Sequence, residues 1–95
     1  MSGYAVVVEC DVRADAGDDA VRLFNGPFKD AIAAQDGFRS VTWLKPVDGQ
    51  SHLLLILFSE QALQERWVSS DLHAEVWSAL EATFSGYRAR SFHAA

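Results

Sequence analysis

The chain has 95 residues, 49% of them hydrophobic, and a formal net charge of −5 at pH 7. This length predicts one domain, residues 1–95, and the acidic balance with scattered Arg and Lys argues against nucleic acid or a membrane surface as a partner. Because Cys10 is the single cysteine, and because we find no signal-peptide pattern and no apolar run long enough to span a bilayer, we expect a cytoplasmic protein without a disulfide.

The N-terminal part of the chain predicts a strand followed by a helix. Residues 4–12 (YAVVVECDV) are rich in strand-forming side chains. Residues 18–35 have apolar side chains that can share one helical face, Phe24 among them. Pro27 restricts the residue before it and removes a backbone donor, so we expect the helix to kink or restart there. Gly37 is expected to follow the end of this helix.

The rest of the chain predicts two strands, a helical segment and a last strand. Residues 38–45 and 52–58 are typical of strands joined by a hairpin. Residues 59–86 predict a helical segment that breaks near Ser70, which can cap its second part, and that continues almost to the end of this range. Residues 87–93 alternate arginines with small residues, so they predict a polar edge strand.

The element order predicts a known architecture and a partner. Strand, helix, two strands, helix and strand is the order of the ferredoxin-like α+β fold, an antiparallel four-stranded sheet with helices on one face. Residues 52–58 are apolar on both sides, and residues 4–12 nearly so. The face of the sheet without helices therefore needs a cover. We expect a symmetric homodimer in which two sheets pack face to face.

Three short motifs point to one family. Asp36-Gly37-Phe38 leads into the second strand, FSEQAL (Phe58 to Leu63) enters the second helical segment, and SSDLH (Ser69 to His73) follows. With these motifs, the chain resembles the antibiotic biosynthesis monooxygenase-like family of dimeric α/β barrels over nearly its full length. The resemblance implies an apolar and aromatic pocket between sheet and helices in each subunit. It also implies one of the family's activities, which are cofactor-free oxidation of phenolic polyketides to quinones, haem degradation and signal-molecule processing.

The catalytic residues of two branches of this family do not carry over to the chain. Quinone-forming members have Asn, Trp and Tyr where this chain has Leu53, Leu57 and Leu63. Haem-degrading members have Asn on the first strand, where this chain offers only Val, Glu, Cys and Asp. Their spacing from Trp to His is also longer than that from Trp67 to His73. The resemblance therefore predicts the fold better than the reaction.

His73 is the candidate catalytic residue. A wheel of the second helical segment places it within an apolar stripe formed by Leu72, Val76, Trp77, Leu80 and Phe84. An imidazole in a pocket could act as general base on a phenolic or carbon-acid proton, and the resulting anion could pass an electron to O₂ without a metal or flavin. The alternative is a histidine packed in the core with one hydrogen bond.

The candidate substrate-binding residues are Trp67, Trp77, Trp43, Phe24 and Leu63. The tryptophans could line a slot for a flat, apolar aromatic ligand, and the alternative for each is ordinary core or dimer packing. We predict no metal site, because the three histidines lack i, i+4 spacing and there is no CxxC pair. We also predict no cofactor, because the chain has no glycine-rich phosphate loop and no dinucleotide fingerprint.

Two functional hypotheses follow from these residues and from the resemblance. The first is a cofactor-independent monooxygenase that acts on an aromatic or polyketide-like small molecule, with His73 as the base. The second is a non-catalytic small-molecule-binding or accessory module of the same fold. A haem-binding or haem-degrading relative that uses His73 is a third possibility. A cyclase or isomerase also stays open, because proton abstraction alone does not determine the product.

Overall fold

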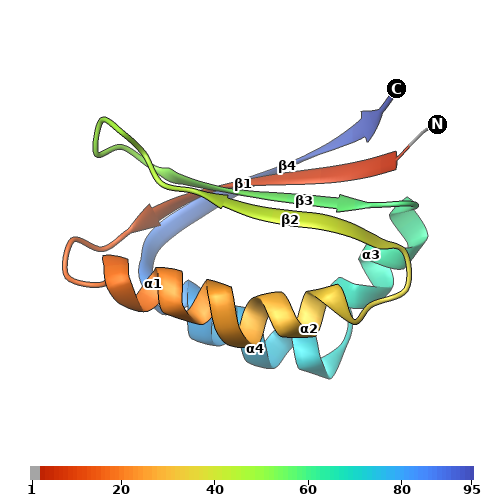
Figure 1. The fold of residues 1–95 in the computed structure, drawn as a ribbon, viewed down its shortest axis with the longest axis horizontal. Coiled ribbons are helices and arrows are strands. Elements are labelled where there is room, and N and C mark those ends of the chain that lie inside the picture. The colour runs from red at the N-terminus through yellow and green to blue at the C-terminus, as the bar shows by residue number, and fades with distance from the viewer. Residues whose placement is uncertain (1–2) are drawn as a thin grey trace.

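The computed structural model describes residues 3–95, which form one antiparallel sheet with helices on one face (Figure 1). The elements in chain order are β1 (Gly3–Val12), α1 (Gly17–Leu23), the π-helical turn η1 (Phe24–Phe28), α2 (Lys29–Ala33), β2 (Phe38–Leu44), β3 (His52–Phe58), α3 (Gln61–Val68), α4 (Asp71–Glu81) and β4 (Phe84–Ala94). The strands lie in the order β2-β3-β1-β4. This order confirms the predicted ferredoxin-like α+β fold.

The first helical segment is continuous but changes its geometry at Pro27. α1 runs into η1, which contains Pro27, and α2 follows without a gap. Proline has no backbone N–H and its ring crowds the preceding turn, and a wider π-helical turn accommodates both effects. The expected disturbance at Pro27 is present, as a π-helical turn within a continuous helix and not as a restart. Its consequence is that η1 buries Phe24 and Phe28 in the core.

The second helical segment breaks where expected but ends earlier. The Ser70 hydroxyl accepts a hydrogen bond from the backbone N–H of His73 at 3.1 Å and donates one to the carbonyl of Trp67 at 2.7 Å. One side chain therefore caps α4 and closes α3. The expectation that the helix reaches Phe84 is wrong, because α4 ends before it and Phe84 opens β4. Pairing with Val12 of β1 draws Phe84 into the sheet.

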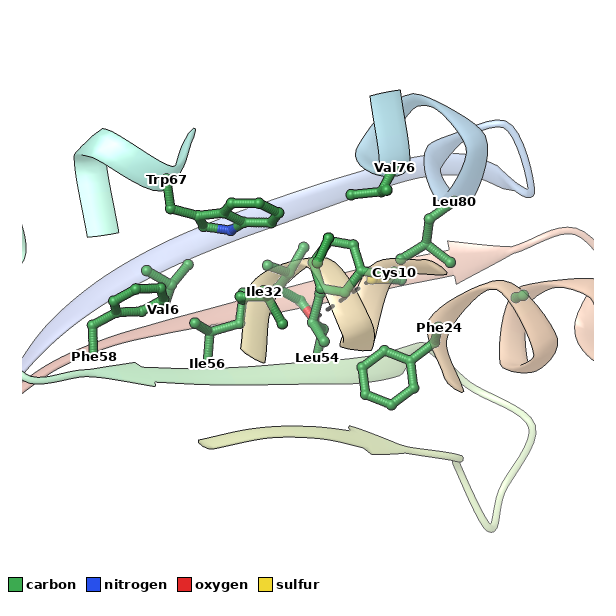
Figure 2. Packing of buried hydrophobic residues seen from close by; sticks show 14 of the residues in the cluster. Val6, Cys10, Phe24, Ile32, Leu54, Ile56, Phe58, Trp67, Val76 and Leu80 are labelled. Atoms are coloured by element: carbon green, nitrogen blue, oxygen red, sulfur yellow. Dashed lines mark hydrogen bonds between the residues drawn. The ribbon is translucent and has the colours of Figure 1, made fainter. Parts of the chain in front are cut away.

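The core lies between the sheet and the helices, and Figure 2 shows Trp67 of α3 lying over Val6 and Ile56 of the sheet. Leu72, which the wheel places in the apolar stripe, is instead 42% exposed. It lies at the margin of the buried side of α4, which is centred near Val76. The largest fully buried side chains are those of Trp67, Phe28, Phe58, Ile32, Leu54, Leu80 and Cys10.

The other face of the sheet carries no helix (Figure 1), yet much of it is apolar. Leu44 and Phe92 on this face are 44% and 40% exposed. The strand register places on it the apolar side chains of Ala5, Val7, Leu44, Leu53, Leu55, Leu57 and Phe92. The packing of a second copy against this face stays a prediction. Separately, residues 3–95 contain no helix that is both long and apolar enough to cross a membrane.

Candidate functional site

A pocket of about 170 Å³ lies between the helices and the sheet. α3, α4 and η1 form one side, and the helix-facing residues of β1, β3 and β4 form the other. Val68 and Tyr87 are 44% and 43% exposed, so they mark its mouth. No Asp, Glu, Lys or Arg side chain lines this pocket. Its walls are therefore apolar and aromatic, with a few neutral polar groups.

His73 reaches the pocket from the first turn of α4. Its ring meets Trp67 edge-on, with centroids 5.0 Å apart, and stacks on Trp77 at 6.1 Å with an interplanar angle of 14°. The imidazole is half-buried, and this burial lowers its pKa from 6.5. No residue in the range 3–95 hydrogen-bonds the imidazole. The neutral form of the ring is therefore favoured at pH 7, and no hydrogen bond from the described residues occupies its nitrogens.

Trp67 and Trp77 form an aromatic wall next to His73. Both pack on Phe28, with ring centroids 6.1 and 6.2 Å away. Trp67 is fully buried, whereas Trp77 is half-buried and meets Tyr87 at the mouth, with centroids 5.2 Å apart. The structure thus brings together three of the sequence-predicted site residues, His73, Trp67 and Trp77.

Trp43 and Phe24 lie in a second aromatic cluster that does not line the pocket. Their rings are 5.5 Å apart, and the indole N–H of Trp43 donates to Nδ1 of His52 at 3.0 Å. Burial, and then the charge of Lys45, lower the pKa of His52. Phe84 joins the two clusters, because its ring lies 6.2 Å from Trp43 and 5.9 Å from Trp77. Phe24 packs on the pocket-lining Phe28, with ring centroids 6.2 Å apart, so this cluster supports the pocket from behind its wall.

Leu63 lies on the other side of Trp67. It packs against the turn at Gly37 and lines a separate hollow of about 180 Å³ together with Asp36 and Arg66. Trp67 lines both this hollow and the pocket, and it is the residue that the two have in common. Of the six predicted site residues, Leu63, Trp43 and Phe24 therefore fall outside the pocket that contains His73.

Gln64, Phe28 and Tyr87 line the pocket and were not singled out from the sequence. Gln64 is only 7% exposed, and it precedes Trp67 by three positions, which places the two on one helical face. Tyr87 pairs with Cys10 of β1, so strand alternation turns both toward the helices. Each signal was present in the spacing. The sequence nevertheless favours solvent exposure for both residues, because a glutamine in a helix and a residue of a polar edge strand are usually exposed.

The remaining reactive groups lie away from the pocket. Cys10 has no exposed surface, and burial raises the pKa of its thiol to about 12. It is therefore not available as a thiolate nucleophile. In the part of the chain that the structure describes, no three His, Cys, Asp or Glu side chains come together in a way that could hold a metal ion. The titratable side chains of the pocket are those of His73 and Tyr87.

Known proteins with this fold were found among solved structures, whereas no family model and no curated protein matches the chain. SnoaB, a cofactor-independent oxygenase from Streptomyces nogalater, superposes with a TM-score of 0.85 at 19% identity, over 97% of this chain and 92% of that one. A monooxygenase from the gene ActVA-Orf6 of Streptomyces coelicolor, in complex with nanaomycin D, gives 0.81 at 22% identity, over 95% and 85%. A dimeric ferredoxin-like protein of unknown function from Thermobifida fusca gives 0.77 at 8% identity, over 96% and 90%. The chain has the fold of the antibiotic biosynthesis monooxygenase-type proteins, as its motifs predicted.

Proposed function

We propose that this protein is a cofactor-independent monooxygenase of an aromatic small molecule, with His73 as general base. The environment of the imidazole carries the proposal. The ring lies between two indoles at the wall of an uncharged pocket, its pKa is lowered by burial, and no residue in the described range hydrogen-bonds it. A neutral imidazole in such a place can take a proton from a phenol held in the pocket.

The proposed reaction balances for a simple phenol such as 1-naphthol. His73 takes the hydroxyl proton, and the naphtholate gives one electron to O₂. The superoxide and the naphthoxyl radical combine at the ring carbon para to the oxygen, and the peroxide anion that forms takes back the proton from His73. Loss of water from the resulting hydroperoxide leaves a 1,4-quinone. One atom of O₂ enters the product and the other leaves as water. The protein contributes proton transfer and an enclosed, oriented site.

The descriptions of two proteins of similar structure support this proposal. SnoaB is described as a cofactor-independent oxygenase, and the Streptomyces coelicolor protein is a monooxygenase bound to nanaomycin D. Both share this fold at low identity, so they supply the reaction class as a hypothesis. The case for this chain rests on its own pocket and on His73.

Oxygen uptake tests the role of His73. Purified, metal-free protein is given 1-naphthol or an anthrone-type phenol in air-saturated buffer, and O₂ consumption is recorded against a protein-free blank. We expect His73→Ala to reduce turnover at least about 100-fold, which is the size of a general-base contribution. His93→Ala is the matched control, because His93 packs on Tyr4 and does not line the pocket. Unchanged turnover in His73→Ala would refute the role of His73.

A non-catalytic binding module is the second candidate, and one observation favours it. No cationic side chain lines the pocket, so none is placed to stabilise a phenolate or peroxide anion. The leucines at positions 53, 57 and 63 do not bear on this choice, because Leu53 and Leu57 face the open side of the sheet and Leu63 lies outside the pocket. The binding module predicts quenching of tryptophan fluorescence by a phenol that is recovered unchanged after incubation in air.

We also propose that two copies pair through their open sheet faces. The apolar side chains of that face include the half-buried Val7 and Leu55, which lie opposite each other on β1 and β3. Burying such a face is favourable in proportion to the apolar area removed from water. The similar protein from Thermobifida fusca is described as dimeric, which supports a dimer of this chain.

A further inference from the structure

We infer that the pocket accepts a neutral aromatic ligand of one or two rings that carries a hydroxyl or carbonyl group, and that the Gln64 amide binds this polar group next to His73. The inference rests on the proposed function for its reaction. It adds the size of the ligand, its charge and the side chain that recognises its polar atom.

The volume of the pocket limits the ligand to a small ring system. The space measures about 170 Å³. An engineered apolar cavity of about 150 Å³ in another protein holds a single benzene molecule. One ring therefore fits inside, and a second ring can extend through the mouth between Val68 and Tyr87, the two exposed lining residues. A third fused ring would project into solvent and add little buried area.

The lining of the pocket selects a neutral ligand. It contains no Asp, Glu, Lys or Arg side chain, and burial of His73, which lowers its pKa, favours the neutral imidazole. A carboxylate bound here would lose its hydration and would meet no side chain that carries a permanent positive charge, which is unfavourable. A phenol or a ketone loses much less on binding, and hydrogen bonds to neutral side chains can replace the bonds it made to water.

Gln64 is a side chain of the pocket that can form a hydrogen bond with the polar group of the ligand. The residue is 7% exposed and lines the pocket, yet none of the described residues hydrogen-bonds its amide. No side-chain nitrogen or oxygen in residues 3–95 is both fully enclosed and without a partner. The amide atoms therefore keep access to open space, and the space next to this buried residue is the pocket.

The position of Gln64 also sets it near the proposed base. Gln64 and Trp67 are three residues apart on α3 and share one face, and Trp67 contacts the ring of His73. An amide offers both a donor and an acceptor, so it can bind a hydroxyl or a carbonyl oxygen. A phenol whose ring lies on the tryptophan wall would then meet both Gln64 and His73.

Anaerobic binding, followed by tryptophan fluorescence, tests the ligand class in the wild-type protein. The probes are 1-naphthol, naphthalene, 1-naphthoate and anthrone. We expect 1-naphthol to bind about tenfold more tightly than naphthalene, which corresponds to one or two hydrogen bonds. We expect 1-naphthoate to bind more weakly than naphthalene, and anthrone to bind no more tightly than 1-naphthol. Equal affinity for 1-naphthol and naphthalene, or tighter binding of 1-naphthoate, would overturn the inference.

The variant Gln64→Leu tests the anchor itself, because leucine keeps an apolar side chain of similar length without the amide. It should reduce the preference for 1-naphthol over naphthalene by about five- to tenfold. Gln61→Leu is the matched control, because Gln61 is exposed on the same helix and outside the pocket. A thermal melt establishes that each variant is folded. An unchanged preference in folded Gln64→Leu would refute the role of Gln64, and if that variant does not fold, the shorter amide of Gln64→Asn replaces it with the same expected loss of preference.

Because the binding assay excludes O₂, the two proposals fail separately. The expected binding pattern without any oxygen uptake would refute the oxygenase and leave the ligand class standing. Oxygen uptake by a protein that does not discriminate 1-naphthol from naphthalene would refute the ligand class and leave the oxygenase standing.

Discussion

The imidazole of His73 shows how neighbouring rings alone can set the properties of a titratable side chain. Trp67 and Trp77 cover it on two sides, and no residue in the described range forms a hydrogen bond with it. Burial disfavours the charged form, so the pKa of His73 falls below its ordinary value of 6.5. The amide of Gln64, unlike the imidazole of His73, does not titrate. It therefore offers the same hydrogen bonds at every pH.

Lowering the pH should reduce turnover and stability together. The folded-state pKa of His73 lies below 6.5 and the unfolded value is near 6.5, so its contribution to stability is fully present above pH 6.5 and is lost as the pH falls through the lowered pKa. Protonation also removes the base, so turnover should fall over the same range. The measurements are turnover and Tm of wild type and His73→Gln between about pH 5 and 8. The pKa of His52 is also lowered, so the difference between the two proteins isolates His73.

The outcome that would contradict this prediction is an identical dependence of Tm on pH in wild type and His73→Gln. In that case groups other than His73, His52 among them, would account for the loss of stability in acid. A level turnover profile down to pH 5, in a protein that stays folded, would equally contradict the role of His73 as base.

At the scale of elements, the position of α3 depends on the turn between α2 and β2. Gly37 has φ +79°, a conformation that favours glycine, and its carbonyl accepts a hydrogen bond from the backbone N–H of Ser59 at 2.7 Å. A Cβ at Gly37 would lie 2.5 Å from Cδ1 of Leu63 and 2.8 Å from Oγ of Ser59. α3 therefore packs directly on this glycine, and α3 carries Gln64 and Trp67 into the pocket.

Gly37→Ala should destabilise the fold by about 2–4 kcal/mol, because backbone strain and overpacking against Leu63 add together. The free energy of unfolding is measured by urea titration. Gly49→Ala is the control, since Gly49 has φ +78° but no neighbour within 4 Å of an added Cβ. It should cost only about 1 kcal/mol, the backbone part. Equal losses in the two variants would show that the contact of Gly37 with Leu63 carries no energy.

At the scale of the whole molecule, the open face of the sheet is an apolar surface that no helix covers. It contains a hollow of about 350 Å³ that is lined by Val7, Leu53 and Phe92 with charged residues beside them. Arg88 lies 3.4 Å from Glu9 and 3.3 Å from Asp11, which places an ion-pair network on the same face. Apolar side chains favour association, and charges at fixed positions favour one register of the two copies.

Leu55→Lys should convert the proposed dimer into a monomer, because it would place an unpaired charge in the centre of the interface. Sedimentation velocity at micromolar concentration measures the assembly. Val47→Lys is the control, because Val47 is fully exposed in the hairpin between β2 and β3. A wild-type protein that sediments as a monomer would refute the pairing, and a dimeric Leu55→Lys would move the interface away from this face.

The sequence by itself determined the elements and their order, because these depend on residues that are close along the chain. The strand at 52–58 follows from a run of strand-forming side chains and is observed with the same bounds. Pro27 and Ser70 act on the backbone within one turn, so the changes in helical geometry at both residues could be predicted. The uncovered apolar face followed from alternation alone.

Only the tertiary structure decided which side chains share the pocket. A helical wheel gives the direction of His73, but not that Trp67 of another helix meets it or that Trp43 lies elsewhere, beside His52. The pairing of Phe84 with Val12, which ends α4 early, is likewise a contact between distant parts of the chain. Periodicity specifies the buried side of an element, whereas strand register and helix packing determine which residues meet there.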